Sequence, residues 1–178
     1  MSIPKGTEIP RGSGQFMKLQ DGKNKLRVLS DVLLGWEGWK DKKPFRHEGQ
    51  VCQIKPEQVD LNQNGLPNIN YFWAMVVWNY TDKKVQVLEI TQKTVMGPLY
   101  ELEQNTDWGD LKDYDVEINK KKEGDKTKYY VLGIPPKPVS KEILEAYVKS
   151  DVDLKKLFLG EYPMNKEEVT SDDSEIPF

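Results

Sequence analysis

The sequence has few residues of the kinds that usually carry enzyme chemistry. It contains one cysteine, Cys52, and one histidine, His47, among 178 residues. A single cysteine cannot form an internal disulfide, and this pair without further soft ligands argues against a zinc site. The chain also has no recognisable serine-nucleophile or metal-carboxylate motif. We therefore expect a protein that is not an enzyme and that uses no cofactor or metal.

The sequence also lacks a long hydrophobic run. No stretch approaches the roughly 20 apolar residues that a helix needs to cross a bilayer. Apolar residues make up 37% of the chain and charged residues 31%, which suits one packed domain of ordinary size. We expect a cytoplasmic protein with a flexible arm in residues 1–15, a folded domain in residues 16–160 and a tail in residues 161–178.

Charge is distributed unevenly along the chain. The formal net charge is −3, but residues 161–178 hold six acidic residues and one lysine. The remaining 160 residues contain 25 basic and 23 acidic side chains. The folded part is thus mildly basic, which favours a nucleic-acid partner only if the positive charge gathers on one face.

Alternating apolar residues predict five strands. The segment 25–29 places Leu26 and Val28 on an inward face and its basic residues outward. Dense aromatic and β-branched residues predict a hairpin from 71–78 and 85–90, and a second hairpin follows from 114–120 and 128–132. The segment 50–70 is expected to be mostly loop, with a short extra strand or helix.

Helical spacing occurs in three places. One helix is expected to end near Asn105 and either to begin near Gly97-Pro98 or to kink there. Ser140 is a candidate N-cap for a second helix, and Asp151 for a short one that ends at Phe158.

Three strands, a helix and two strands make up the order of a five-stranded OB barrel, with its helix between strands three and four. The sequence therefore predicts a mainly β fold of the OB type, followed by short C-terminal helices. Another small barrel, or an α+β sheet, would have the same order of elements.

Aromatic and basic residues are mixed around the first two strands. This mixture suits single-stranded nucleic acid, because bases stack on aromatic rings while lysines and arginines follow the phosphates. Alternation means that about half of the residues in 71–80 must face the core, and the sequence does not decide which half. The candidate nucleic-acid-binding residues are Lys25, Arg27, Trp36, Trp39, Lys40, Lys43, Arg46, Tyr71, Trp73, Trp78, Tyr80 and Lys84.

The C-terminal tail forms a second candidate site. Its acidic residues keep it extended, while the apolar end and terminal carboxylate suit a basic-rimmed pocket on another protein. A terminus of accidental composition is the alternative interpretation. The candidate partner-binding residues are Asp172, Asp173, Glu175, Ile176, Pro177 and Phe178.

Two resemblances to known proteins follow from these segments. The Ile-Pro-Phe ending resembles the acidic tip of bacterial-type single-stranded DNA-binding proteins, although Glu175 interrupts the usual run of aspartates. The body resembles bacteriophage single-stranded DNA-binding proteins over residues 16–141. The segments that carry this second resemblance are Asn24–Ser30, Gly35–Trp39, Phe72–Ala74, Val77–Tyr80 and Asn105–Asp115.

These resemblances imply an OB fold that coats single-stranded DNA with little sequence preference. They also imply a role in replication, recombination or repair in the host-cell cytoplasm, with other replication proteins recruited by the tail. Because the tail and DNA are both anionic, we expect deletion of residues 167–178 to tighten DNA binding at low salt. RNA binding is a near variant, since stacking does not distinguish the sugars.

Two other functions remain open at this stage. One is an adaptor that binds only protein, in which the aromatic residues form the core. The other is a metal-dependent nuclease that uses Asp110, Asp113 and Asp115, although these residues lack a metal-binding spacing.

Overall fold

The computed structural model describes residues 14–164 as a mainly β fold with two α-helices. Three short 3₁₀ helices complete the described part: η1 (Pro56–Gln58), η2 (Leu111–Asp113) and η3 (Leu154–Leu159). The predicted class of fold is therefore confirmed. In chain order the larger elements are β1 (Gly22–Val28), β2 (Leu33–Lys40), β3 (Lys43–Glu48), β4 (Ile69–Asn79), β5 (Lys84–Ile90), α1 (Lys93–Gln104), β6 (Asp115–Glu123), β7 (Lys126–Gly133) and α2 (Lys141–Ser150).

The strands form one antiparallel sheet in the order β3-β2-β4-β1-β6-β7, and β5 pairs with β4. Strand β4 is central because one of its edges pairs with β2 along its first half and with β1 near its end. Its other edge pairs with β5. Within residues 14–164 no strand pairing joins β7 or β3 back to β5, so the sheet is not closed. The prediction of a five-stranded barrel is wrong.

Two strands that the sequence did not predict, β2 and β3, account for the difference in strand number. The two glycines of β2 resemble loop signals in the sequence, but both occupy close approaches within the sheet. A Cβ atom at Gly35 would lie 2.7 Å from the carbonyl oxygen of His47, and one at Gly38 would lie 2.7 Å from the ring of Phe45. The Asp41-Lys42 turn between the strands has positive φ angles at both residues, which matches a tight hairpin turn without glycine.

The two faces of β4 pack against different helices. Met75 and Val77 belong to the main core together with Val95 and Leu99 of α1, and we call this side the α1 face. Val76 packs with Ile143 of α2, and other residues on that side pack with Leu157 of η3. We call it the α2 face. Helical segments therefore cover both faces of the strand.

The predicted helices are largely confirmed. Helix α1 lies between β5 and β6 and begins at Lys93, so Pro98 falls inside it. Ser140 caps α2 by accepting a hydrogen bond from the Ile143 backbone N–H. Asp151 does not cap the next helix, because it ends α2 in a left-handed conformation, and Asp153 caps η3 instead.

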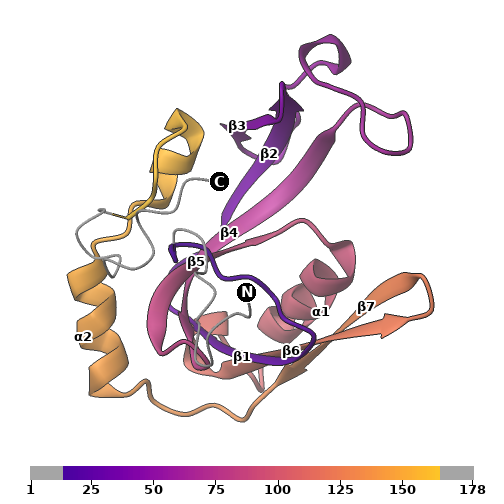
Figure 1. Cartoon of the computed structure of the whole chain (residues 1–178). Helices are drawn as coiled ribbons and strands as arrows, with labels where there is room; N and C mark the ends of the chain where they lie inside the picture. The colour runs from indigo at the N-terminus through magenta and orange to yellow at the C-terminus, as the bar shows by residue number, and fades with distance from the viewer. Residues whose placement is uncertain (1–13, 165–178) are drawn as a thin grey trace, which may run out of the picture.

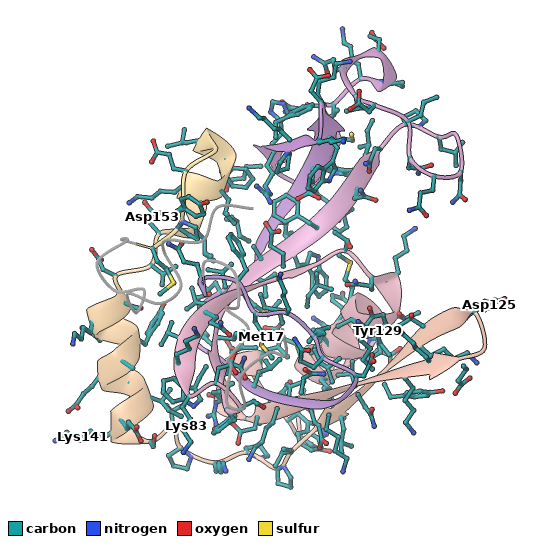
Figure 2. All side chains as sticks on the ribbon, viewed as in Figure 1. Met17, Lys83, Asp125, Tyr129, Lys141 and Asp153 are labelled. Carbon is teal, nitrogen blue, oxygen red and sulfur yellow. The ribbon has the colours of Figure 1, made fainter. Side chains whose placement is uncertain are left out.

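Figure 1 separates the molecule into two regions. Strands β2 and β3, the first half of β4 and the segment between β3 and β4 project from the rest, and we call residues 33–74 the arm. The body contains the main core and the β6–β7 hairpin. Figure 2 labels Met17 in this core and Asp125 at the far tip of the hairpin. No helix among the described residues has the length and apolar character needed to span a membrane.

Candidate nucleic-acid interface

Aromatic side chains form a row across the arm. Trp36 is the register partner of His47 on β3 and of Tyr71 on β4, so all three lie on one face. The rings of Trp36 and Tyr71 are 5.2 Å apart with an interplanar angle of 46°. Trp73 follows Tyr71 on the same face, which continues the α1 face of the body. We call Trp36, His47, Tyr71 and Trp73 the aromatic row.

A hydrogen bond holds Trp36, one ring of the row, in place while leaving ring surface open. The indole N–H of Trp36 donates to the backbone oxygen of Gln50 at 3.0 Å, which fixes the ring orientation. Trp36, Tyr71 and Trp73 are half-buried, and His47 is exposed. Partly exposed, fixed aromatic rings are what base stacking requires.

Lysines gather at the tip of the β2–β3 hairpin, at one end of the aromatic row. Lys40 and Lys43 are register partners, and alternation along β2 puts Lys40 on the same face as Trp36. Lys42 is exposed in the turn between them. Lys40 also forms an ion pair with Asp60 at 3.5 Å. This tip is the basic end of the row.

A cavity of about 450 Å³ lies at the other end of the row, where the arm meets the body. Tyr71 and Trp73 of β4 form part of its wall, and Tyr100 of α1, which is 57% exposed, forms another part. The full lining is Ser30, Asp31, Val32, Leu34, Gln50, Tyr71, Trp73, Tyr100, Glu103, Asp110 and Leu111.

The polar wall of the cavity is acidic. Asp31 accepts a 2.7 Å hydrogen bond from the Lys112 ammonium group, which lowers the pKa of Asp31. Asp110 accepts from the Lys112 backbone N–H. The Glu103 carboxylate has no hydrogen bond or ion pair with any residue in the range 14–164, and burial, followed by the charge of Asp110, raises its pKa. The row therefore runs from a basic tip to an acidic cavity.

Three predicted site residues lie away from the row, on the α2 face of the body. Arg27 and Asp115 form a buried ion pair at 3.3 Å, with side chains 2% and 0% exposed. Arg27 also donates to the backbone oxygens of Lys112 and Lys137. Tyr80 donates to Asp115 at 2.7 Å, and Lys25 lies 4.5 Å above the Tyr80 ring.

This cluster stabilises the body. Burial alone would raise the pKa of Asp115, but hydrogen bonds from Tyr80, Lys137 and Arg27 outweigh it and lower the pKa. Burial, with the Asp115 hydrogen bond, raises the pKa of Tyr80 to about 12. A buried guanidinium group with these partners is not available to a phosphate, so we exclude Arg27 from the interface.

Four further predicted residues also lie away from the row. Trp78 is buried in the cluster that contains Ile143 of α2. Trp39 points to the face opposite Trp36, and its indole N–H donates to Glu37. Arg46 bridges Glu37 and Glu89, with both ion pairs at 3.0 Å. Lys84 begins β5, at the end of β4 far from the arm. Of the predicted residues, Trp36, Tyr71 and Trp73 therefore belong to the row, and Lys40 and Lys43 lie at its tip.

Sequence reasoning did not identify two aromatic residues of this surface. The sequence singled out His47 only together with Cys52, as a possible metal ligand, and Tyr100 is not among the predicted site residues. The alternation of Phe45 and His47 along β3 was the available signal, because it places both rings on the face of Trp36. For Tyr100 the signal was an aromatic residue next to the buried Leu99 on an amphipathic helix.

The acidic residues considered for a nuclease do not form a metal centre. Within residues 14–164 no group of three or more histidine, cysteine, aspartate or glutamate side chains is arranged to hold a metal ion. Asp110 caps η2, while Asp115 is held by Arg27 and Lys137. Asp113 is exposed.

The candidate partner-binding residues at the C-terminus, 172 to 178, lie outside the described residues, as does most of the predicted N-terminal arm. Comparisons with models of known families, with curated proteins and with solved structures found no match.

Proposed function

We propose that this protein binds single-stranded DNA without catalysing a reaction, and that the bases stack along the aromatic row of the arm. The observation that carries the proposal is the placement of Trp36, Tyr71 and Trp73 on one face with their rings partly exposed. Each stacked base contributes roughly 1–3 kcal/mol and requires no particular sequence. Binding on this row is therefore expected to depend little on sequence.

The lysine tip supports the same proposal. Lys40, Lys42 and Lys43 offer positive charge at one end of the row, where the phosphates of a stacked strand can be neutralised. A duplex stacks its bases internally and cannot offer them to the row. The preference for single strands over duplex follows from this difference.

The role of the tail is a second part of the proposal and rests on the sequence alone. The acidic segment ending in Ile176-Pro177-Phe178 recruits replication, recombination or repair proteins to the coated strand.

The test is the fluorescence anisotropy of a labelled 15-residue thymidine oligonucleotide, with the full-length protein and two variants. Trp36→Ala removes one stacking ring and is expected to weaken binding roughly 5- to 150-fold. Tyr130→Ala is the matched control, because Tyr130 is an aromatic residue that is 48% exposed on β7, far from the row. Its affinity is expected to equal that of the unmodified protein.

Equal weakening by both variants would contradict the placement of DNA on the row. No binding of the oligonucleotide by the unmodified protein would overturn the proposal and favour an adaptor that binds only protein. A labelled duplex of the same length is expected to bind far more weakly than the single strand, and a uridine oligonucleotide compares RNA with DNA.

A further inference from the structure

The cavity at the acidic end of the row has chemistry that the proposed stacking does not use. Its volume of about 450 Å³ lies within the range of ligand pockets, roughly 300–1,000 Å³. Tyr71 and Trp73 belong both to the cavity wall and to the aromatic row. A strand stacked on the row therefore passes the mouth of the cavity, and one of its bases can enter.

The carboxylates of the cavity decide which part of a nucleotide fits. Ionised carboxylates accept hydrogen bonds and repel phosphate, so they match a group rich in N–H donors. The Watson–Crick edge of guanine has two adjacent donors, the ring N1–H and the 2-amino group. That of thymine has one N–H between two carbonyl oxygens, which a carboxylate repels. A carboxylate therefore discriminates between these two bases.

Glu103 is the carboxylate best placed for this role. Asp31 is held by the Lys112 ammonium group, and Asp110 accepts from a backbone N–H. Glu103 lines the same cavity, and its carboxylate has no hydrogen-bond or ion-pair partner among residues 14–164. Its acceptor oxygens are thus available to a ligand.

We propose that the cavity takes one unstacked base of a bound single strand and selects guanine, with Glu103 accepting from its N1–H and 2-amino groups. The inference rests on the proposed function and adds a local base preference to binding that is otherwise independent of sequence. Stacking against Tyr71 or Trp73 holds the base, and Glu103 reads its edge. An arginine or lysine side chain from a protein partner is the competing occupant, since aromatic rings and carboxylates also suit a cation.

Three labelled 15-residue oligonucleotides test the inference with the full-length protein. The first contains only thymidine, the second has one central deoxyguanosine, and the third has deoxyinosine there, which keeps the N1–H but lacks the 2-amino group. The guanine oligonucleotide is expected to bind about tenfold more tightly than the thymidine one, with the inosine oligonucleotide between them.

Two variants with the same change in charge complete the design. Glu103→Gln is expected to remove the guanine preference, so that the guanine and thymidine oligonucleotides bind with affinities within about twofold of each other. Glu101→Gln is the control, because Glu101 is exposed on the same helix and does not line the cavity. This variant is expected to retain the preference.

The outcomes separate the inference from the function on which it rests. Binding of all three oligonucleotides with equal affinity overturns the inference and leaves the proposed function standing. Failure of the thymidine oligonucleotide to bind overturns both. Equal tightening of all three by Glu103→Gln overturns the inference, because it shows that the carboxylate only repels phosphate. A fourth outcome is that a tetra-arginine peptide binds and that Glu103→Gln abolishes this binding, while the oligonucleotides show no guanine preference. This outcome assigns the cavity to a cation and also overturns the inference.

Discussion

The body and the arm of this protein are stabilised in different ways. The body has a large apolar core in which residues of β1, β4, β5, β6 and α1 pack together, with side chains such as Leu26 and Ile118 almost fully buried. In the arm, Leu61 and Leu66 are mostly exposed, and no hydrophobic cluster lies wholly within it. The arm therefore depends on strand pairing and on a few contacts with its surroundings.

Several of those contacts lie on the α2 face of the arm. Arg46 bridges Glu37 of the arm and Glu89 of β5, and its guanidinium carbon lies 5.8 Å from the Phe72 ring centre. Phe72 in turn packs near Phe158 of η3. Because one face is fixed in this way, the other can keep its aromatic rings partly exposed. The body thus carries most of the stability, and the arm carries the surface on which we propose that DNA binds.

The largest effect is expected from breaking the buried ion pair of the body. Asp115→Ala leaves the Arg27 guanidinium buried without its partner, which typically costs about 3–5 kcal/mol. The free energy of unfolding from urea titration measures the loss. Oligonucleotide affinity of the folded variant is expected to stay unchanged, since this cluster lies away from the row. A loss below about 1 kcal/mol would show that the pair is not a main support of the body.

A smaller and more local effect is expected from Arg46→Met. This variant leaves Glu37 and Glu89 without their shared cation, and we expect a loss of about 1–3 kcal/mol. Hydrogen exchange is the appropriate measurement, because the backbone amides of β2 and β3 should exchange faster while those of β1 and β6 stay protected. Uniform acceleration in both regions would contradict the separation of arm and body.

The lysine tip is expected to influence binding without changing stability. For single strands, each phosphate contact contributes roughly 0.7 to the slope of log affinity against log salt concentration. Replacing both Lys40 and Lys43 with alanine should therefore reduce that slope by about 1.4. Oligonucleotide titrations at four salt concentrations measure it. An unchanged slope would place the phosphates elsewhere.

The smallest effect concerns pH and has opposite signs at two carboxylates. Burial raises the pKa of Glu89 above 4.5, despite the nearby Arg46. The folded state therefore binds this proton more tightly than the unfolded state, so the stabilisation is present below pH 4.5 and lost as pH rises through the folded-state pKa. Glu89→Gln should flatten this part of the stability profile, as measured by urea titration across pH.

Asp115 is expected to show the reverse. Its pKa lies below 3.8 in the folded state, so its stabilisation is present above pH 3.8 and lost as pH falls through the folded-state pKa. Asp115→Asn is the matching variant. The same sign of pH dependence for both carboxylates would contradict the different environments described for them.

The sequence predicted the body better than the arm. Alternation located β1, β4 and β5 because Leu26, Val28 and their partners face one continuous core. Alternation did not locate β2 and β3, because Gly35, Gly38 and Pro44 hide the pattern although every residue of both strands has a register partner. Without these two strands the sequence predicts five strands, the number in an OB barrel, whereas the sheet has seven strands and is open.

The candidate site was predicted only in part, because alternation along a strand does not report contacts with distant segments. Alternation could not decide which face of β4 is exposed to solvent, because α1 covers one face and α2 with η3 covers the other. Alternation along β1 predicted that Arg27 points to solvent. Instead its buried guanidinium group donates to the backbone oxygens of Lys112 and Lys137, which come from distant segments. Such long-range contacts leave no periodic signal in the sequence.

The most direct test of the central claim is photo-cross-linking of the full-length protein to a thymidine oligonucleotide that carries 5-iododeoxyuridine, followed by identification of the linked peptides. Iodouracil reacts with aromatic side chains that stack against it. We predict cross-links at Trp36, Tyr71 or Trp73. Cross-links confined to Tyr130 and the β6–β7 hairpin, from an oligonucleotide that binds, would contradict the assignment of binding to the arm.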